Sequence, residues 1–177
     1  MSRFPRPLFL ALGLMTAVSP AARAMPPGSP EAAEALALCE RADRHVGSGR
    51  VELLDRGASL AEARVAADPR DALAHFAVFC NLGRRMQGSG FGIGTPFEML
   101  HALRALDAAL ALAPDDPDVL TAKGAITLEL PRLFGGDPDG AEAWFRRALE
   151  RDPTHARARE YLDCVLGHRT AAVSASR

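Results

Sequence analysis

The cysteines Cys39, Cys80 and Cys164 carry the most reactive side chains of this chain of 177 residues. No two are spaced as Cys-x-x-Cys, and none stands with a histidine at the spacing of a zinc site. An odd count leaves at least one thiol free even where disulfides form. Two interpretations stay open: three small buried side chains in helices, or a disulfide between Cys39 and Cys80.

Sequence signatures of catalysis and cofactor binding are absent. The chain has no HExxH, GxxxxGK[ST] or GxSxG motif. Glycine alternates with other residues over Gly88–Gly94, but Ile93 breaks the GxGxxG pattern, which favours a loop. Asp137–Gly140 begins like a calcium loop without the closing glutamate, so a helix cap explains it better. With five histidines scattered along the chain, the sequence predicts no enzyme, no cofactor and no metal.

Charge and composition limit the classes of partner and fold. The formal net charge is −1, from 21 basic and 22 acidic residues, which argues against electrostatic binding to nucleic acid. Hydrophobic residues make up 48% and aromatic residues 6% of the chain. A chain rich in Ala, Leu, Arg and Glu favours helices over strands, and its hydrophobic fraction is too high for a disordered protein.

The first 24 residues have the layout of a secretory signal peptide. Arg3 and Arg6 precede the apolar run Leu8–Val18, and Ala22–Ala24 forms a small-x-small cleavage site. The run is too short to span a bilayer, which needs about 20 residues. We therefore expect cleavage near Ala24, export to the periplasm or secretion, and no integral membrane segment in the remaining chain.

Proline and glycine divide the rest of the chain into helices. Ser29-Pro30, Thr95-Pro96, Asp116-Pro117 and Asp137-Pro138 each place a capping side chain before a proline at the first helical position. Between these starts apolar residues recur every three and four positions, and no stretch alternates like a strand. The predicted helices are 30–46, 51–67, 71–87, 96–113, 117–130, 138–151 and 154–167. Residues 25–29 are a predicted linker and 169–177 a predicted disordered tail, leaving one helical domain over 30–168.

The helices form pairs with a repeated pattern. Pro114 and Pro153 each close an Ala-rich second helix with the same small-x3-bulky-x2-small spacing, and Gly124 holds the small position of a first helix. The residues that carry the pattern are Ala102, Leu106, Ala109, Pro114, Gly124, Ala141, Phe145, Ala148 and Pro153. This pattern resembles the tetratricopeptide repeat (TPR), well over 71–167 and weakly over 30–69. The resemblance implies an all-α fold, a short right-handed α-solenoid of about three to four stacked helix-turn-helix pairs.

The repeats depart from the family length of about 34 residues. Extra residues fall between the two helices of a pair, in the segments 88–94 and 130–136. The second segment, with the Ala141–Ala148 pattern behind it, resembles the stretched repeats of exported proteins such as the T-component associated with TRAP transporters. That family is thought to associate with a periplasmic solute-binding protein and is often lipid-anchored, whereas this chain lacks the cysteine for such an anchor.

The first helix of each pair lines the concave side of such a solenoid. Counting from the prolines, we predict a groove of mixed polarity formed by Phe76, Cys80, Arg84, Thr121, Ala125, Glu129, Glu160 and His168. A groove of this kind is suited to a protein or peptide segment of unknown identity. A merely solvated face is the alternative interpretation.

Three functions compete. The first is an exported, non-enzymatic scaffold that binds a protein or peptide partner in the groove. The second is a small-ligand or lipid-binding helical repeat protein of a periplasmic transport system, in which the apolar residues Phe91, Ile93, Leu133 and Phe134 close a cavity. The third, an enzyme of unrecognised type, needs a cluster of titratable groups that the sequence does not offer.

Overall fold

The computed structural model describes residues 28–89, 95–131 and 136–175, and all regular elements within these ranges are helices. The prediction of an all-α fold is therefore confirmed. The seven helices in chain order are α1 (Pro30–Ala42), α2 (Ser48–Ala67), α3 (Ala72–Ser89), α4 (Thr95–Leu112), α5 (Pro117–Glu129), α6 (Pro138–Arg151) and α7 (Ala156–Ala175).

The helices lie close to where the sequence places them, and the largest differences are at the end of α1, the start of α2 and the end of α7. Helix α1 ends at Ala42 and not at Val46, because its last turn tightens into three-residue hydrogen bonds such as His45 N to Ala42 O (3.1 Å). Gly47, at a φ of +66°, then turns the chain into α2. Val46, the last residue of the predicted first helix, is 91% exposed.

The last helix is longer than predicted. Helix α7 continues to Ala175, through most of the segment 169–177 that the sequence assigned to a disordered tail. Alanines at 171, 172 and 175 explain this extension, since alanine has the highest intrinsic helix propensity.

Helix starts follow the predicted capping in two of the three places where the capping side chain is described. The Ser29 hydroxyl accepts a hydrogen bond from Ala32 N (3.1 Å), and the Asp116 carboxylate accepts from Asp118 N and Val119 N. Asp137 is followed by Pro138 at the first helical position, yet its side chain makes no capping bond. The sequence missed the cap of α3, where Asp71 Oδ1 accepts from Ala74 N (3.0 Å).

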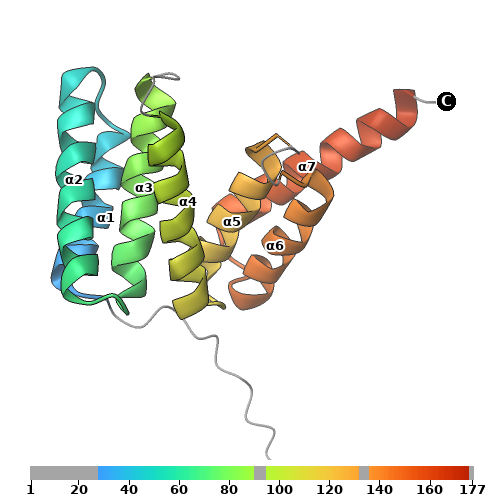
Figure 1. Cartoon of the computed structure of the whole chain (residues 1–177). Helices are drawn as coiled ribbons and strands as arrows, with labels where there is room; N and C mark the ends of the chain where they lie inside the picture. The colour runs from blue at the N-terminus through green and yellow to red at the C-terminus, as the bar shows by residue number, and fades with distance from the viewer. Residues whose placement is uncertain (1–27, 90–94, 132–135, 176–177) are drawn as a thin grey trace, which may run out of the picture.

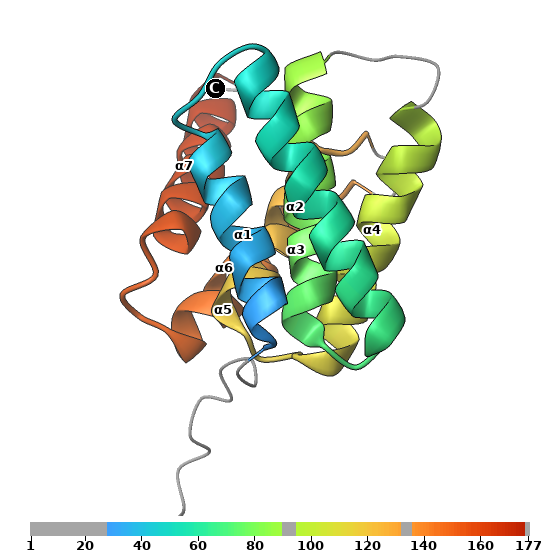
Figure 2. The same cartoon turned by 90° about the vertical axis from the view of Figure 1, so that its left-hand side faces the viewer.

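Each helix packs mainly on its neighbours in sequence. The pairs α1–α2, α3–α4 and α5–α6 are closely packed, and α1 and α2 both contact α3. Figure 1 shows α1–α4 standing side by side, with α5–α7 as a second group inclined to them; Figure 2 shows the first group from the side. The second group joins the first where α4 leads into α5.

Small residues let the first three helices approach closely. Ala35, Ala58, Ala61 and Ala77, from α1, α2 and α3, are buried in one cluster. Alanine at a helix crossing brings two backbones together without a void. Leu106 lies in another cluster with Phe76 and Val119, joining α3 and α4 to α5.

A buried amide ties α3 to α1. Asn81, with 0% of its surface exposed, donates hydrogen bonds from Nδ2 to Ala35 O on α1 (3.0 Å) and Ala77 O in its own helix (2.8 Å). Its Oδ1 faces Gly57 of α2, where an added Cβ would lie 2.2 Å away. One polar side chain therefore fixes the positions of three helices.

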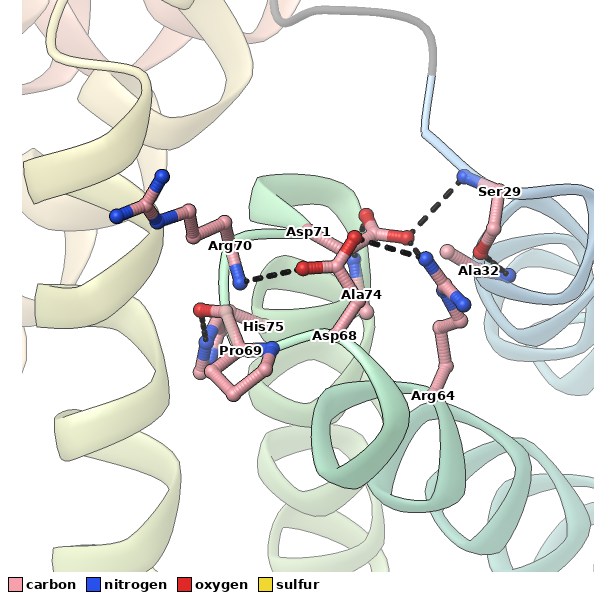
Figure 3. A network of polar contacts seen from close by, with 9 residues as sticks. All are labelled: Ser29, Ala32, Arg64, Asp68, Pro69, Arg70, Asp71, Ala74 and His75. Carbon is pink, nitrogen blue, oxygen red and sulfur yellow. Dashed lines mark hydrogen bonds and ion pairs between the residues drawn. The ribbon is translucent and has the colours of Figure 1, made fainter.

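The carboxylate of Asp71 links the start of α1, the end of α2 and the start of α3 (Figure 3). Asp71 Oδ2 accepts hydrogen bonds from Ser29 N (3.1 Å) and Arg64 Nε (3.0 Å), while Oδ1 caps α3. Burial acts to raise the pKa of Asp71, but the bonds from Ala74, Arg64 and Ser29 outweigh it and lower the pKa from 3.8 to about 2. Both carboxylate oxygens accept from donors that belong to the fold, so this pKa shift is part of the structural network.

No helix in the described part of the chain combines the length and the apolar character needed to cross a membrane. The predicted signal peptide, residues 1–24, and most of the predicted linker lie outside the described residues.

Candidate binding cleft

A cleft of about 490 Å³ lies between the two groups of helices, with walls from α3, α4, α5 and α7. Pockets for small-molecule ligands commonly have volumes of about 300–1,000 Å³. The cleft exists because the α3–α4 pair and the α5–α6 pair meet through the cluster around Leu106 and Val119 at one end and separate beyond it.

Apolar side chains form much of the wall. Phe76 and Phe79 of α3 lie with their ring centroids 6.2 Å apart and line the cleft together. The remaining apolar side chains in the wall come from three helices: Met86, Met99, Ala102, Leu103, Ala122, Ala125 and Ile126. Methionine and aromatic side chains adapt to partners of different shape.

Charged groups of both signs stand in the wall. Arg84 of α3 and Arg157 of α7 contribute positive charge, and Asp118 and Glu129 of α5 contribute negative charge. Burial acts to lower the pKa of Arg84, but the hydrogen bond to Asp43 outweighs it and raises this pKa, so the guanidinium keeps its charge.

Tyr161 of the cleft wall, and His155 beside the wall residue Asp118, hold fixed orientations. Tyr161 of α7 stacks on the buried ring of Phe145, with centroids 5.1 Å apart and planes inclined by 2°. Burial and the charge of Glu129 raise the pKa of Tyr161, which leaves the phenol neutral near pH 7. His155 Nδ1 accepts from Ala158 N, so Nε2 carries the proton and donates to Asp118 Oδ1 (3.1 Å).

Six of the eight predicted groove residues line this one cleft. They are Phe76, Cys80, Arg84, Thr121, Ala125 and Glu129. Thr121 is only 2% exposed, and its hydroxyl donates to Pro117 O (2.7 Å) within the helix. The Thr121 hydroxyl therefore has no proton left to donate to a ligand in the cleft.

The last helix differs from the prediction. Glu160 is exposed and is not among the residues that line the cleft, whereas Arg157 and Tyr161 are. The count from Pro153 predicted that Glu160 faces the groove, whereas the residue three positions earlier, Arg157, lines the cleft. Tyr161, four residues after Arg157 and on the same face of α7, lines it as well. The side chain of His168 lies outside the part that the structure describes.

The predicted repeat positions divide by burial. Ala102, Leu106, Ala109, Gly124, Ala141, Phe145 and Ala148 are buried, and the two prolines, Pro114 and Pro153, are exposed in the turns. Phe145 lies in a cluster with Ala141 and Val165, between the α5–α6 pair and α7. Ala102 also lines the cleft, and Phe145 contacts the cleft residue Tyr161 through stacked rings.

The cleft wall carries a thiol, Cys80, and no recognisable metal site among the described residues. In the described part of the chain, no three His, Cys, Asp or Glu side chains are grouped so as to hold a metal ion. All three cysteines are free thiols: Cys39 is buried, Cys80 half-buried in the cleft wall and Cys164 exposed. The residues Phe91, Ile93, Leu133 and Phe134, expected to close a cavity, lie outside the described residues.

No protein-family model matches the chain, and a search of curated proteins found no match in sequence. The functional interpretation therefore depends on the cleft itself.

Proposed function

We propose that this protein is a non-enzymatic scaffold that binds an extended segment of a protein or peptide partner in the cleft. We propose further that its helix pairs are TPR-like and form a short right-handed α-solenoid. The contacts between successive helices and the small residues at their crossings support this arrangement. The cleft is lined by α3, α5 and α7, the first helices of successive pairs, with α4 beside them.

One observation carries the proposal: six groove residues predicted from repeat spacing surround a single cleft of about 490 Å³. The alternative interpretation, in which these residues form only a solvated face, does not account for a cleft at this position. Apolar floor residues with charges around them are typical of sites that fix a peptide by side-chain pockets and by polar contacts at its edges.

The charges indicate which peptide chemistry fits. Arg84 and Arg157 suit carboxylates, and Arg84 is held in place by Asp43. Glu129, on the α5 wall, suits a basic group. A segment with an apolar centre flanked by charges of both signs is therefore the expected occupant.

The compartment and pathway are also proposals. Residues 1–24 support export with cleavage near Ala24, which would place the cleft in the periplasm or outside the cell. The segment 130–136 supports a role beside a transport system, as in the T-component associated with TRAP transporters.

A second candidate function is the binding of a small ligand or lipid. The observation in its favour is the paired rings of Phe76 and Phe79 with the thioethers of Met86 and Met99 in a cleft of suitable volume. The charged residues in the same wall favour the peptide.

Site-specific photocrosslinking tests the proposal. A photoreactive phenylalanine analogue at Ala125, in the cleft wall, is compared with one at Val51, which is 44% exposed on α2. We expect a discrete protein adduct in the native compartment from position 125 and none from position 51. Arg84→Glu and Glu129→Arg, each in the position-125 background, should reduce the adduct at least tenfold.

Native mass spectrometry of the purified protein distinguishes the alternatives. A bound lipid or small molecule without a protein adduct at position 125 would favour the second candidate. Equal adducts from positions 125 and 51, unaffected by either charge reversal, would contradict the peptide-binding proposal.

A further inference from the structure

We propose that Cys39 and Cys80 form a dithiol that exchanges with an external disulfide through the cleft and is converted to an intramolecular disulfide between α1 and α3. The proposal is independent of the peptide-binding function, because it rests on the thiols behind the cleft wall and not on any occupant.

The two cysteines face each other across the α1–α3 crossing. Cys39 lies in a buried cluster with Ala42 and Leu54, and Cys80 packs against this cluster. The two thiols are close enough for each to shift the pKa of the other, which is lowered for Cys39 and raised for Cys80. A disulfide needs Cα atoms about 4.4–6.8 Å apart, a separation that only closely crossing helices provide.

Two polar contacts hold the helices together on either side of the thiols. One turn before Cys39, Ala35 O accepts from Asn81 Nδ2 at 3.0 Å. One turn after Cys39, Asp43 forms an ion pair with Arg84, which lies one turn after Cys80. These contacts flank Cys39 on α1, and on α3 they are made by Asn81, next to Cys80, and by Arg84, so the register of the two helices at the cysteines is fixed.

The cleft gives access to one member of the pair. Cys80 is half-buried and lines the cleft, whereas Cys39 is 3% exposed. A small disulfide that enters the cleft therefore meets Cys80 first. Cys164 is exposed on α7 and stands outside the pair.

The surroundings favour the second step of the exchange. In the dithiol, the hydrogen bond from the Cys80 thiol and the charge of Arg84 lower the pKa of Cys39 against the effect of burial. Once Cys80 is in the mixed disulfide its thiol proton is gone, and the charge of Arg84 continues to favour the Cys39 thiolate. The hydrogen bond to Cys39 and burial raise the pKa of Cys80, so the first attack, by Cys80, is the slower step and resolution by Cys39 follows it.

The exchange balances with one external disulfide as the oxidant. Cys80 loses its proton to water and its sulfur attacks one sulfur of the external disulfide, whose other sulfur leaves as a thiolate. Cys39 then loses its proton and attacks Cys80 Sγ, forming the Cys39–Cys80 bond and releasing the second external thiolate. The two thiolates take up the two protons, so the protein loses two electrons and the external disulfide gains them.

Equilibration with glutathione tests the proposal in a Cys164→Ser background of the full chain. The protein is incubated with oxidised and reduced glutathione in varied ratio, quenched with acid, alkylated, digested and analysed by mass spectrometry. We expect both remaining thiols to be lost together as the ratio of oxidised glutathione rises, with a Cys39–Cys80 peptide as the product. Cys39→Ala should instead accumulate a glutathione adduct on Cys80, and Cys80→Ser should leave Cys39 unmodified.

The chain with all three cysteines gives a measurement that does not depend on variants. In native buffer the Cys39–Cys80 pair should dominate over pairs with Cys164, and in concentrated urea this preference should disappear. The same distribution of pairs in both solvents would overturn the proposal. Glutathione that stays on Cys80 of the Cys164→Ser protein, with no intramolecular bond, would also overturn it.

Discussion

The ring of Phe145 occupies the space that a side chain at Gly124 would need. A Cβ built on Gly124 would lie 2.6 Å from Cε1 of Phe145, closer than the two atoms can approach. The opposing helices α5 and α6 are therefore in contact through backbone on one side and an aromatic ring on the other. Gly124 is required because it has no side chain, and not because of its backbone conformation. Among the described residues only Gly47 has a positive φ.

Gly124→Ala should lower the free energy of unfolding by about 1–3 kcal/mol, because overpacking exceeds the gain in helix propensity. Gly83→Ala is the matched control, since Gly83 is also inside a helix and has nothing within 4 Å of an added Cβ. It should stabilise the protein by up to about 1 kcal/mol. Urea unfolding followed by circular dichroism measures both, and equal effects would refute the steric argument.

Phe145→Ala should cost about 3–5 kcal/mol, because the ring is 0% exposed and its removal leaves a cavity between α5, α6 and α7. Phe97→Ala removes the same atoms from a side chain that is 80% exposed and should change stability by less than about 0.5 kcal/mol. Thermal or urea unfolding of the two variants checks the difference. A loss of less than about 1 kcal/mol for Phe145→Ala would show that this side chain is not part of a packed core.

The sequence predicts the helices because proline, capping residues and apolar spacing are local signals. Pro117 and Asp116, for example, mark the start of α5 within a single turn. Most of the groove residues predicted from the repeat spacing also line the cleft, because residues four apart on one helix share a face.

Contacts between distant residues are what the sequence does not reveal. Whether Tyr161 or Glu160 faces the cleft depends on the rotation of α7 about its own axis. That rotation is set by packing between helices, including the stacking of Tyr161 on Phe145. The Asp71 network joins Ser29, Arg64 and Ala74 from three segments, and no spacing rule relates them. The Asp71–Ala74 cap was a readable signal, since Asp71 follows Pro69 at a helix start.

Asn81→Asp should cost about 3 kcal/mol or more near pH 7, because a buried carboxylate would face the carbonyls of Ala35 and Ala77. Burial would raise the folded-state pKa of the new group above its unfolded value, so the variant should lose stability as pH rises from about 4 to 7. Urea unfolding at several pH values measures the slope. The exposed Gln87→Glu change on the same helix is the control and should show a difference below about 0.5 kcal/mol.

Asp71 should make the protein sensitive to acid. Its folded-state pKa of about 2 lies below the ordinary value of 3.8, so its stabilising contribution is complete above pH 3.8 and is lost as pH falls toward 2. The side chain is only 3% exposed, and a pKa difference of this size corresponds to about 2 kcal/mol.

Asp71→Asn should therefore remove about 2 kcal/mol at pH 7 and progressively less between pH 4 and pH 2, so that the stability curves of the two proteins converge in acid. Asp55→Asn is the control, because Asp55 pairs with Arg85 but its side chain is 50% exposed, and the change should cost less than about 1 kcal/mol. Urea unfolding at half-unit steps of pH gives the difference directly. Other carboxylates titrate equally in both proteins, so only the difference in their free energies of unfolding reports on Asp71. If this difference stayed constant down to pH 2, the stabilisation would come from hydrogen bonds that do not depend on the charge.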